Sequence, residues 1–374
     1  MNYDLNEEQT LIREAAKKFF SKECPSQFVR DMAEDDTGYT PAFWQGMAEM
    51  GWMGLLVPEA YGGYDASFLD LMVLLAEMGY AAAPGPFFST VVLGGLPLLT
   101  AGSDEQKAAF LPGIASGERL ATLAWTEEAG RYTPEAVQVR ATADGTAYVL
   151  SGAKRFVPDA HVADVMICAA RTGDDAQDIS LFLVDAKSPG ISVSPLITMA
   201  GDKQCEVKFD AVNVPGEALL GEINRGWPVL RQVQLTAAVA KCAEMTGGAR
   251  KAMDLVTPWA KERIQFGRPI GAFQAVQHHC ANMLTYLDTL TYMTYQASWL
   301  ISEGKPFDRE AAMCKAYVSD AYRKLVAIAH QVLGGLGFME EHDLGLYFKR
   351  AKAAELFFGD ADVHREVVAE EMGL

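Results

Sequence analysis

The chain lacks any pair of cysteines at the spacing of a metal or redox motif. Its six cysteines stand singly, without a Cys-x-x-Cys pair or a Cys/His cluster, so the sequence predicts neither a metal site nor a disulfide framework. It also lacks an apolar run long enough to cross a membrane, and its polar, acidic first residues are unlike a signal peptide. Scattered thiols are typical of a reducing interior. We therefore expect a cytoplasmic protein.

Basic residues are few compared with acidic ones. The 374 residues hold 32 Lys and Arg against 49 Asp and Glu, which gives a formal net charge of −17. Such a surface repels nucleic acid and anionic membranes, so neither is an expected partner. A ligand that carries phosphate would need a local group of basic side chains and backbone N–H groups. Half of the residues are hydrophobic, as in ordinary folded proteins, and the length predicts two or three domains.

The first part of the chain, residues 1–117, has the residue spacing of amphipathic helices. Its apolar residues recur at intervals of three and four, as they do on one face of a helix. Asp104 is predicted to be the N-cap of the last of these helices. The clearest helices are expected at residues 41–50, 68–80, 87–99 and 104–114.

The pattern changes between residues 118 and 222. Short β-branched runs appear there, separated by Asp-Gly, Ser-Gly and Pro-Gly turn signals. The connections are too short for crossover helices, which favours antiparallel pairing. Strands are expected at residues 137–140, 148–150, 165–168 and 179–184.

Helical spacing returns in the last part of the chain, residues 223–374. Long helical runs are expected at 232–265 and 273–303. Pro258 lies inside the first run, where a proline is expected to kink the helix or to open a new segment.

Two motifs in this last part indicate a cofactor site. The sharper one is Glu-Arg-Ile-Gln-Phe-Gly-Arg-Pro-Ile at residues 262–270, followed by Phe273 and Gln274. The second is Gln-Val-Leu-Gly-Gly-Leu-Gly-Phe at residues 331–338, where paired glycines let the backbone approach a bulky ligand. A lone glycine pair would be equally typical of a helix end. Together and in this order, the two motifs resemble the FAD-binding segments of the acyl-CoA dehydrogenases.

The resemblance implies an α+β multidomain protein with the acyl-CoA dehydrogenase fold. An N-terminal α-helical domain would cover residues 1–117, a middle antiparallel β-barrel domain 118–222 and a C-terminal four-helix bundle 223–374. The bundle would contact FAD, with the Arg263 guanidinium donating to the pyrophosphate. The other residues that the resemblance assigns to the FAD site are Gln265, Phe266, Phe273, Gln274, Gln331, Val332, Gly334 and Gly335.

The catalytic base of the family is missing from both of its usual positions. Members of the family remove the α-proton of a CoA thioester with a carboxylate, which is most often a Glu near the C-terminus. Phe358 stands at that position here, and Ala237 stands at the alternative position early in the bundle. Asp360 is expected to point elsewhere on its turn, and Glu244 is expected to be a partly buried or surface helix residue. No catalytic residue is therefore assigned to this chain.

The part of the site that would hold the flavin ring also departs from the family pattern. After Thr126 and Glu127 the usual Ser-Asp pair is absent, and a usual Trp-Ile-Thr run is replaced by Phe-Val-Pro at residues 156–158. Proline offers neither a hydroxyl nor an N–H group. The half-site for the flavin ring is therefore expected to be damaged, whereas the half-site for adenine and pyrophosphate is expected to be intact.

This asymmetry favours a subunit that lacks the base and works beside a partner that has it. In this respect the chain is similar to the smaller subunits of the α2β2 acyl-CoA dehydrogenases. Those enzymes act on bulky CoA thioesters such as those of steroid side chains. The expected partners are an acyl-CoA substrate, a homologous subunit and an electron-transfer flavoprotein as acceptor. Three alternatives stay open: a homotetramer with an unusual base, a non-catalytic structural subunit, and a CoA-thioester reaction that needs no α-proton base.

Overall fold

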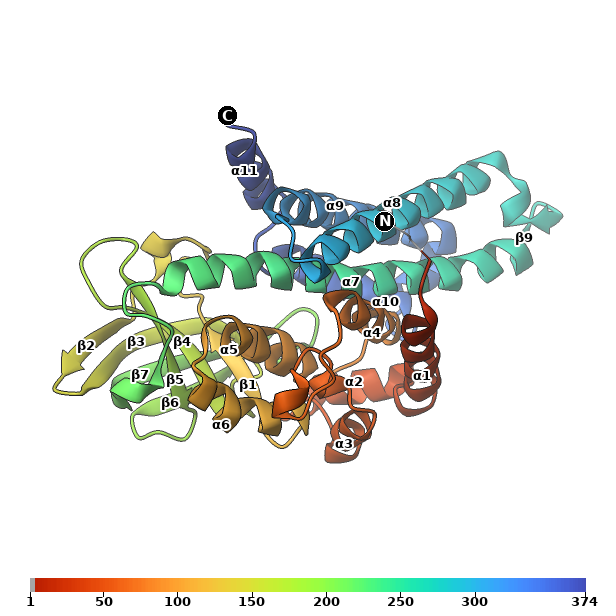
Figure 1. The fold of residues 1–374 in the computed structure, drawn as a ribbon. Helices are drawn as coiled ribbons and strands as arrows, with labels where there is room; N and C mark the ends of the chain where they lie inside the picture. The colour runs from red at the N-terminus through yellow and green to blue at the C-terminus, as the bar shows by residue number, and fades with distance from the viewer. Residues whose placement is uncertain (1–3) are drawn as a thin grey trace. The chain divides into compact units, whose positions relative to one another are not determined.

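The structure is a computed structural model that describes residues 4–374 (Figure 1). It divides into two compact units. The first unit contains the residues up to Arg30 together with 67–83 and 238–374, and the second contains 31–66 and 84–237. Two helices, α2 (Ser26–Glu34) and α7 (Gly226–Glu262), contribute residues to both units.

The first unit is helical. Helix α9 packs against α8, α10 and α11, and α4 packs against α1 and α8 (Figure 1). Buried apolar residues recur along one face of α9, among them Val318, Leu325 and Val326, so this helix supplies much of the core. Besides its part of α7, the unit contains α1 (Glu7–Glu23), α4 (Phe68–Ala81), α8 (Gln274–Ser302), α9 (Asp308–Leu333), α10 (Leu344–Leu356) and α11 (Ala361–Glu371).

Helix α7 differs from the sequence prediction at both ends and in its middle. It begins at Gly226, ends at Glu262 and continues through Pro258, so the proline does not open a new segment. A proline removes one backbone hydrogen bond. Val256 and Ala260 on either side of it are buried, and their packing keeps the helix continuous. The helix ends before residue 265 because a short hairpin begins at Ile264.

The helical part of the second unit shows two further differences from the prediction. Ser103, not Asp104, is the N-cap of α6 (Asp104–Ala115), because its hydroxyl accepts from the Gln106 backbone N–H at 3.2 Å. The helix expected at 87–99 is present without a break, but its first part is a π-helix, Phe88–Gly95, which continues into α5 (Leu96–Ala101), where Pro97 occupies the first turn. The unit also contains α3 (Pro41–Glu49) and the 3-10 helices Trp52–Gly54, Glu59–Tyr61, Pro134–Ala136 and Gly216–Ala218.

The strands of the second unit form one sheet with the order β6-β7-β3-β2-β4-β5-β8, and β1 pairs with β4. Most neighbours are antiparallel, as expected, but β4 pairs in parallel with both β1 and β2. The prediction of antiparallel pairing is wrong here because residues 125–139 connect β1 to β2 without reversing the direction of the chain, so both strands run in the same direction beside β4. The strands are β1 (Ala121–Ala124), β2 (Arg140–Asp144), β3 (Ala147–Pro158), β4 (Val165–Arg171), β5 (Ile179–Asp185), β6 (Ile191–Leu196), β7 (Gln204–Pro215) and β8 (Leu219–Leu220).

The strand predicted at residues 137–140 is mostly absent. Only Arg140 belongs to β2, although Val137 and Val139 are buried like strand residues. The backbone N–H groups of Gln138 and Val139 donate to the Glu127 carboxylate at 2.9 and 3.0 Å, so a side chain replaces the neighbouring strand as their partner.

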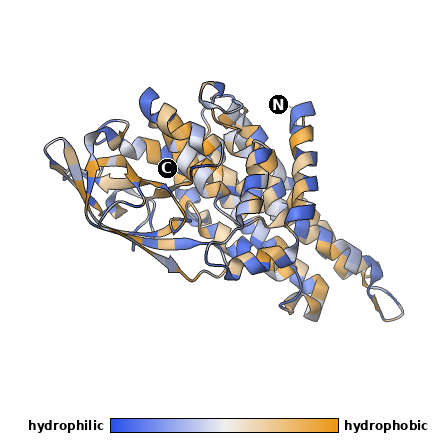
Figure 2. Ribbon diagram, turned by 90° about the horizontal axis from the view of Figure 1, so that it is seen from below, coloured by the Kyte–Doolittle hydropathy of each residue, from blue (hydrophilic) through white to orange (hydrophobic). Residues whose placement is uncertain are grey.

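Figure 2 shows that polar and apolar residues alternate along the helices. Between residues 4 and 374, no helix is both long enough and apolar enough to cross a membrane.

Candidate functional site

The first cofactor motif forms an exposed hairpin at the end of α7. Its strands β9 (Ile264–Gln265) and β10 (Arg268–Pro269) are antiparallel, and Phe266 and Gly267 make the turn between them. Phe266 has a φ of 52°, which is uncommon for a residue with a side chain, and it is 91% exposed. A strained turn that holds an aromatic ring in solvent suits a contact with another molecule.

The two arginines of this hairpin have different surroundings. The Arg268 guanidinium lies 4.1 Å from the centre of the Phe273 ring, and the Phe266 ring meets the same ring edge-on at 6.1 Å. The Arg263 guanidinium lies 5.4 Å from the Trp259 ring and has no carboxylate within ion-pair distance in the described chain. Arg263 is exposed, so its N–H groups can donate to an anionic ligand.

The remaining residues predicted from this motif lie on the same exposed segment. Gln265 is in β9 and Gln274 is the first residue of α8, and both side chains are exposed. Phe273 is half-buried because Arg268 and Phe266 cover it. The structure thus brings Phe266, Arg268 and Phe273 into contact and leaves Arg263 and the two amides open to solvent.

The second motif lies where α9 ends and a 3-10 helix, Gly334–Phe338, begins. Gly334 has φ 63° and ψ −141°, a conformation close to glycine-only backbone space. No atom lies within 4 Å of the place that a Cβ of Gly334 or Gly335 would occupy. Gln331 is exposed, whereas Val332 is buried in the helical core. This end of α9 therefore offers open backbone and one free amide to a ligand, while Val332 could contribute only its backbone.

Neither acid considered as a replacement base is free. The Asp360 carboxylate caps α11, since its Oδ1 accepts from the backbone N–H groups of Asp362 and Val363 at 3.1 and 3.0 Å. Glu244 forms an ion pair with Lys241 on the same helix. Ala237 is fully buried. The geometry thus offers no unpaired carboxylate at the positions that the sequence comparison with the family had suggested.

The turn between α10 and α11, residues 357–360, is held by buried polar groups that sequence reasoning missed. Lys315 of α9 donates to the backbone oxygens of Glu355 and Gly359, each at 2.9 Å. His364 of α11 donates from Nε2 to the Phe358 backbone oxygen at 2.9 Å. A lysine on the buried face of α9 was a visible signal for Lys315, but the two backbone oxygens that it binds lie forty or more residues away.

The buried imidazole of His364 gives a prediction for stability against pH. Burial, with a smaller effect of the positive charge of Lys315, lowers its pKa to about 4. In the unfolded chain a histidine has a pKa of about 6.5, so the unfolded chain binds more protons between about pH 6.5 and 4. The free energy of unfolding is therefore expected to fall as the pH falls through this window.

The expected loss is about 3 kcal/mol, because each pKa unit corresponds to about 1.4 kcal/mol. This loss in the free energy of unfolding should be absent in His364→Gln, because the glutamine amide keeps a hydrogen-bond donor but does not titrate in this pH range. The measurement is urea unfolding at pH 7 and pH 4, with exposed His278→Gln as the matched control. An equal loss in the wild type and in His364→Gln would assign the acid sensitivity to other groups.

The second unit offers fewer free donors to a flavin ring. The Thr126 hydroxyl donates to the Arg155 backbone oxygen at 2.5 Å, so it is already used inside the chain. Phe156 has a φ of 56°, and Arg155 pairs with Glu206 at 2.9 Å. Pro158 has no N–H group, and its oxygen accepts from a neighbouring hydroxyl. These residues fit a flavin ring poorly, whereas the hairpin and the glycine motif fit a phosphate-bearing cofactor.

Comparisons with known proteins give one consistent result. The sequence families described as acyl-CoA dehydrogenase N-terminal, middle and C-terminal domains match residues 6–118, 122–212 and 224–373. "Probable acyl-CoA dehydrogenase YngJ" of Bacillus subtilis strain 168 is 32% identical over 383 residues, which is 100% of both chains.

Two solved structures have the same fold over nearly the whole chain. A structure reported with the electron transferring flavoprotein of Acidaminococcus fermentans has a TM-score of 0.92 and 28% identity, and covers 100% of this chain and 99% of that one. A variant of the steroid ACAD Tcur3481-Tcur3483 has a TM-score of 0.88 and 28% identity, over 98% of each chain.

Proposed function

Because this chain belongs to the acyl-CoA dehydrogenase family, we propose that it is the base-lacking subunit of an α2β2 heterotetramer. The chain is an FAD-dependent acyl-CoA dehydrogenase, and its substrate class is the acyl-CoA thioesters. Within this class, the substrate that we propose is a CoA thioester of a bulky acyl group, such as a steroid side chain. The similarity to the two-component steroid ACAD supports this choice.

One observation carries the proposal. The position at which the resemblance implies the base holds Phe358, which is buried, and the nearest acid, Asp360, is used as a helix cap. A phenyl ring cannot accept the α-proton of a thioester. The partner subunit would therefore supply the base, and this chain would supply part of the cofactor site.

The residues that would hold FAD lie in the hairpin and in the glycine motif. Arg263 would donate to the pyrophosphate, and Phe266 and Phe273 would give apolar contact beside it. The chemistry that FAD would supply at this site is the acceptance of a hydride from the β-carbon of the thioester. The acceptor that we propose for its electrons is an electron-transfer flavoprotein. The amides and the open backbone that complete the proposed set are Gln265, Gln274, Gln331, Val332, Gly334 and Gly335.

The domain division stays a proposal that rests on the resemblance, with boundaries after residues 117 and 222. The cytoplasmic location expected from the sequence is likewise a proposal.

Co-expression tests the shared site. The chain is produced alone and together with the acyl-CoA dehydrogenase-like gene nearest to its own, and the flavin-to-protein ratio and the mass in solution are measured. The expected result is a colourless or insoluble lone chain and a pair that carries one FAD per two chains. A yellow homotetramer with one FAD per subunit would contradict the proposal and would favour a homomeric enzyme with an unusual base.

A further inference from the structure

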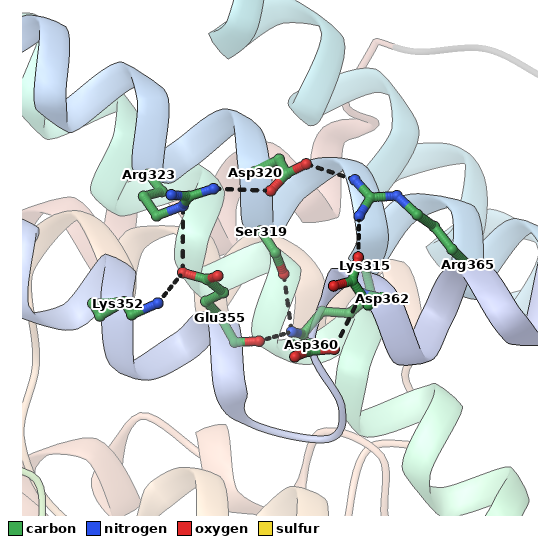
Figure 3. Close-up of polar contacts among 9 residues, drawn as sticks. All are labelled: Lys315, Ser319, Asp320, Arg323, Lys352, Glu355, Asp360, Asp362 and Arg365. Carbon is green, nitrogen blue, oxygen red and sulfur yellow. Dashed lines mark hydrogen bonds and ion pairs between the residues drawn. The ribbon is translucent and has the colours of Figure 1, made fainter.

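The buried ammonium group of Lys315 joins the end of one helix to the turn that follows it. Lys315 is fully buried, and its Nζ donates to the Ser319 hydroxyl at 3.0 Å and to the backbone oxygens of Glu355 and Gly359 (Figure 3). The Glu355 oxygen belongs to the last turn of α10, where carbonyls have no partner within the helix. Three donors thus meet three neutral acceptors, and no carboxylate of the described chain lies within ion-pair distance of Nζ.

His364 holds the same turn from the other side. It lies in the first turn of α11 and is fully buried. A carbonyl oxygen can only accept, so the Nε2 that contacts the Phe358 oxygen at 2.9 Å carries the proton. The two side chains therefore hold the oxygens of two successive residues, Phe358 and Gly359.

The backbone between these two contacts is in an uncommon conformation. Phe358 has a φ of 61° and Gly359 a φ of 98°, so two successive residues lie in left-handed space. A phenylalanine stays in such a conformation only where its surroundings hold it there. Asp360 completes the support by capping α11. Every residue from 358 to 360 thus has a polar atom held by a buried side chain or a helix end.

Surface ion pairs tie the three helices together around this point. The Glu355 carboxylate pairs with Arg323 of α9 at 3.5 Å and with Lys352 of α10 at 3.1 Å. Asp320 of α9 pairs with Arg365 of α11 at 2.6 Å (Figure 3). Exposed pairs of this kind contribute little each, so the buried contacts of Lys315 and His364 are the ones that fix the turn.

We propose that Lys315 and His364 are positioning residues that fix the 357–360 turn and so aim the side chain of residue 358 as one wall of the acyl-CoA site. The fixed turn follows from the contacts described above, whereas its place in the acyl-CoA site rests on the proposed function. The wall shapes the pocket and takes no part in proton transfer, so its loss should affect substrate binding more than turnover.

Hydrogen exchange and kinetics of the enzyme in its isolated assembly test the two parts separately. Lys315→Met removes the donors and keeps most of the volume, and His364→Phe removes the other donor. Each variant is expected to speed amide exchange in residues 357–364 about tenfold, with α8 unchanged. Each is also expected to raise KM for the acyl-CoA about tenfold and to change kcat less than about threefold. Exposed Lys324→Met on the same helix is the matched control.

A conservative variant and a milder one keep the test decisive. His364→Gln can still donate to the Phe358 oxygen and should restore slow exchange and a low KM. Ser319→Ala removes one of the three acceptors of Lys315 and should give an intermediate effect even if Lys315→Met does not fold. Unchanged exchange in both Lys315→Met and His364→Phe would overturn the positioning role, and so would unchanged exchange in Ser319→Ala if Lys315→Met does not fold.

The pH profile gives a readout that a merely structural role would not move. Burial lowers the pKa of Lys315 to about 8, against an opposing effect of its acidic neighbours. A neutral amine has two donors for three acceptors, so KM should rise above about pH 8 in the wild type and stay flat in Lys315→Met. The titratable groups that face Lys315 come from α7, α9, α10, the turn and α11: Cys242, Cys314, Glu355, Asp360 and His364.

The outcomes separate the inference from the proposed function. An assembly that turns over no acyl-CoA would remove the proposed function, while the exchange data would still decide whether the two side chains hold the turn. Faster exchange with an unchanged KM in an active assembly would show that the turn is no wall of the acyl-CoA site.

Discussion

Replacing Arg263 with methionine is expected to weaken FAD binding by roughly tenfold to a hundredfold. Hydrogen bonds to a charged group contribute about 1.5–3 kcal/mol, and about 1.4 kcal/mol corresponds to a tenfold change in affinity. Arg263 is exposed and unpaired by any carboxylate of the described chain, so its loss should leave the fold intact. The measurement is the dissociation constant of FAD, from fluorescence titration of the flavin-free assembly.

Arg268 provides the matched control for this prediction. It lies in the same hairpin, but its guanidinium covers the Phe273 ring at 4.1 Å, so Arg268→Met should change FAD affinity by less than about threefold. Similar losses in both variants would point to damaged hairpin packing. An unchanged affinity in Arg263→Met would contradict the phosphate contact itself.

The parts that sequence alone predicted well are those whose signal is local. Helical spacing located most of α3, α4, α6 and α8, because an amphipathic face is written into neighbouring residues. The hairpin turn at Phe266 and Gly267, where both residues have positive φ, was not predicted, because residue 265 was expected to end a helical run.

The errors occurred where a distant partner decides the structure. Val137 and Val139 have the character of strand residues, but the neighbouring N–H groups are bound by Glu127, about ten residues away. The parallel pairing of β1 with β4 depends on the path of residues 125–139, which connect β1 to β2. Sequence spacing contains neither fact, since both are set by tertiary packing.

The support of the 357–360 turn shows the same limit at the candidate site. Lys315 stands out as a charge on an apolar helix face, and His364 lies four residues beyond Asp360. Neither position reveals that the two side chains meet the oxygens of adjacent residues. The residue type at position 358 could be read from the sequence, whereas the geometry around that position could not.

The second large effect is expected in the other unit, where Lys154 and Glu127 form a buried ion pair. The Lys154 Nζ donates to Glu127 Oε1 at 2.7 Å and to the Trp125 backbone oxygen at 3.0 Å. Both side chains are buried. Lys154→Met would leave the carboxylate without the one cation that pairs with it among residues 4–374, which is expected to destabilise the chain by about 3–5 kcal/mol. Urea unfolding at pH 7 measures this difference.

Glu127→Gln is expected to cost less than Lys154→Met, because its amide oxygen can still accept from Lys154 and from the backbone N–H groups of Gln138 and Val139. The double variant Lys154→Met/Glu127→Gln removes both charges and should recover part of the lost stability, which tests whether the unpaired carboxylate is the cause. Losses of equal size in the two single variants, with no recovery in the double variant, would assign the effect to packing. Glu127 also holds the segment between β1 and β2. A recovery of stability in the double variant should therefore restore the fold of the residues beside Thr126 and Phe156. A flavin site that needs no partner subunit would have to form at these residues.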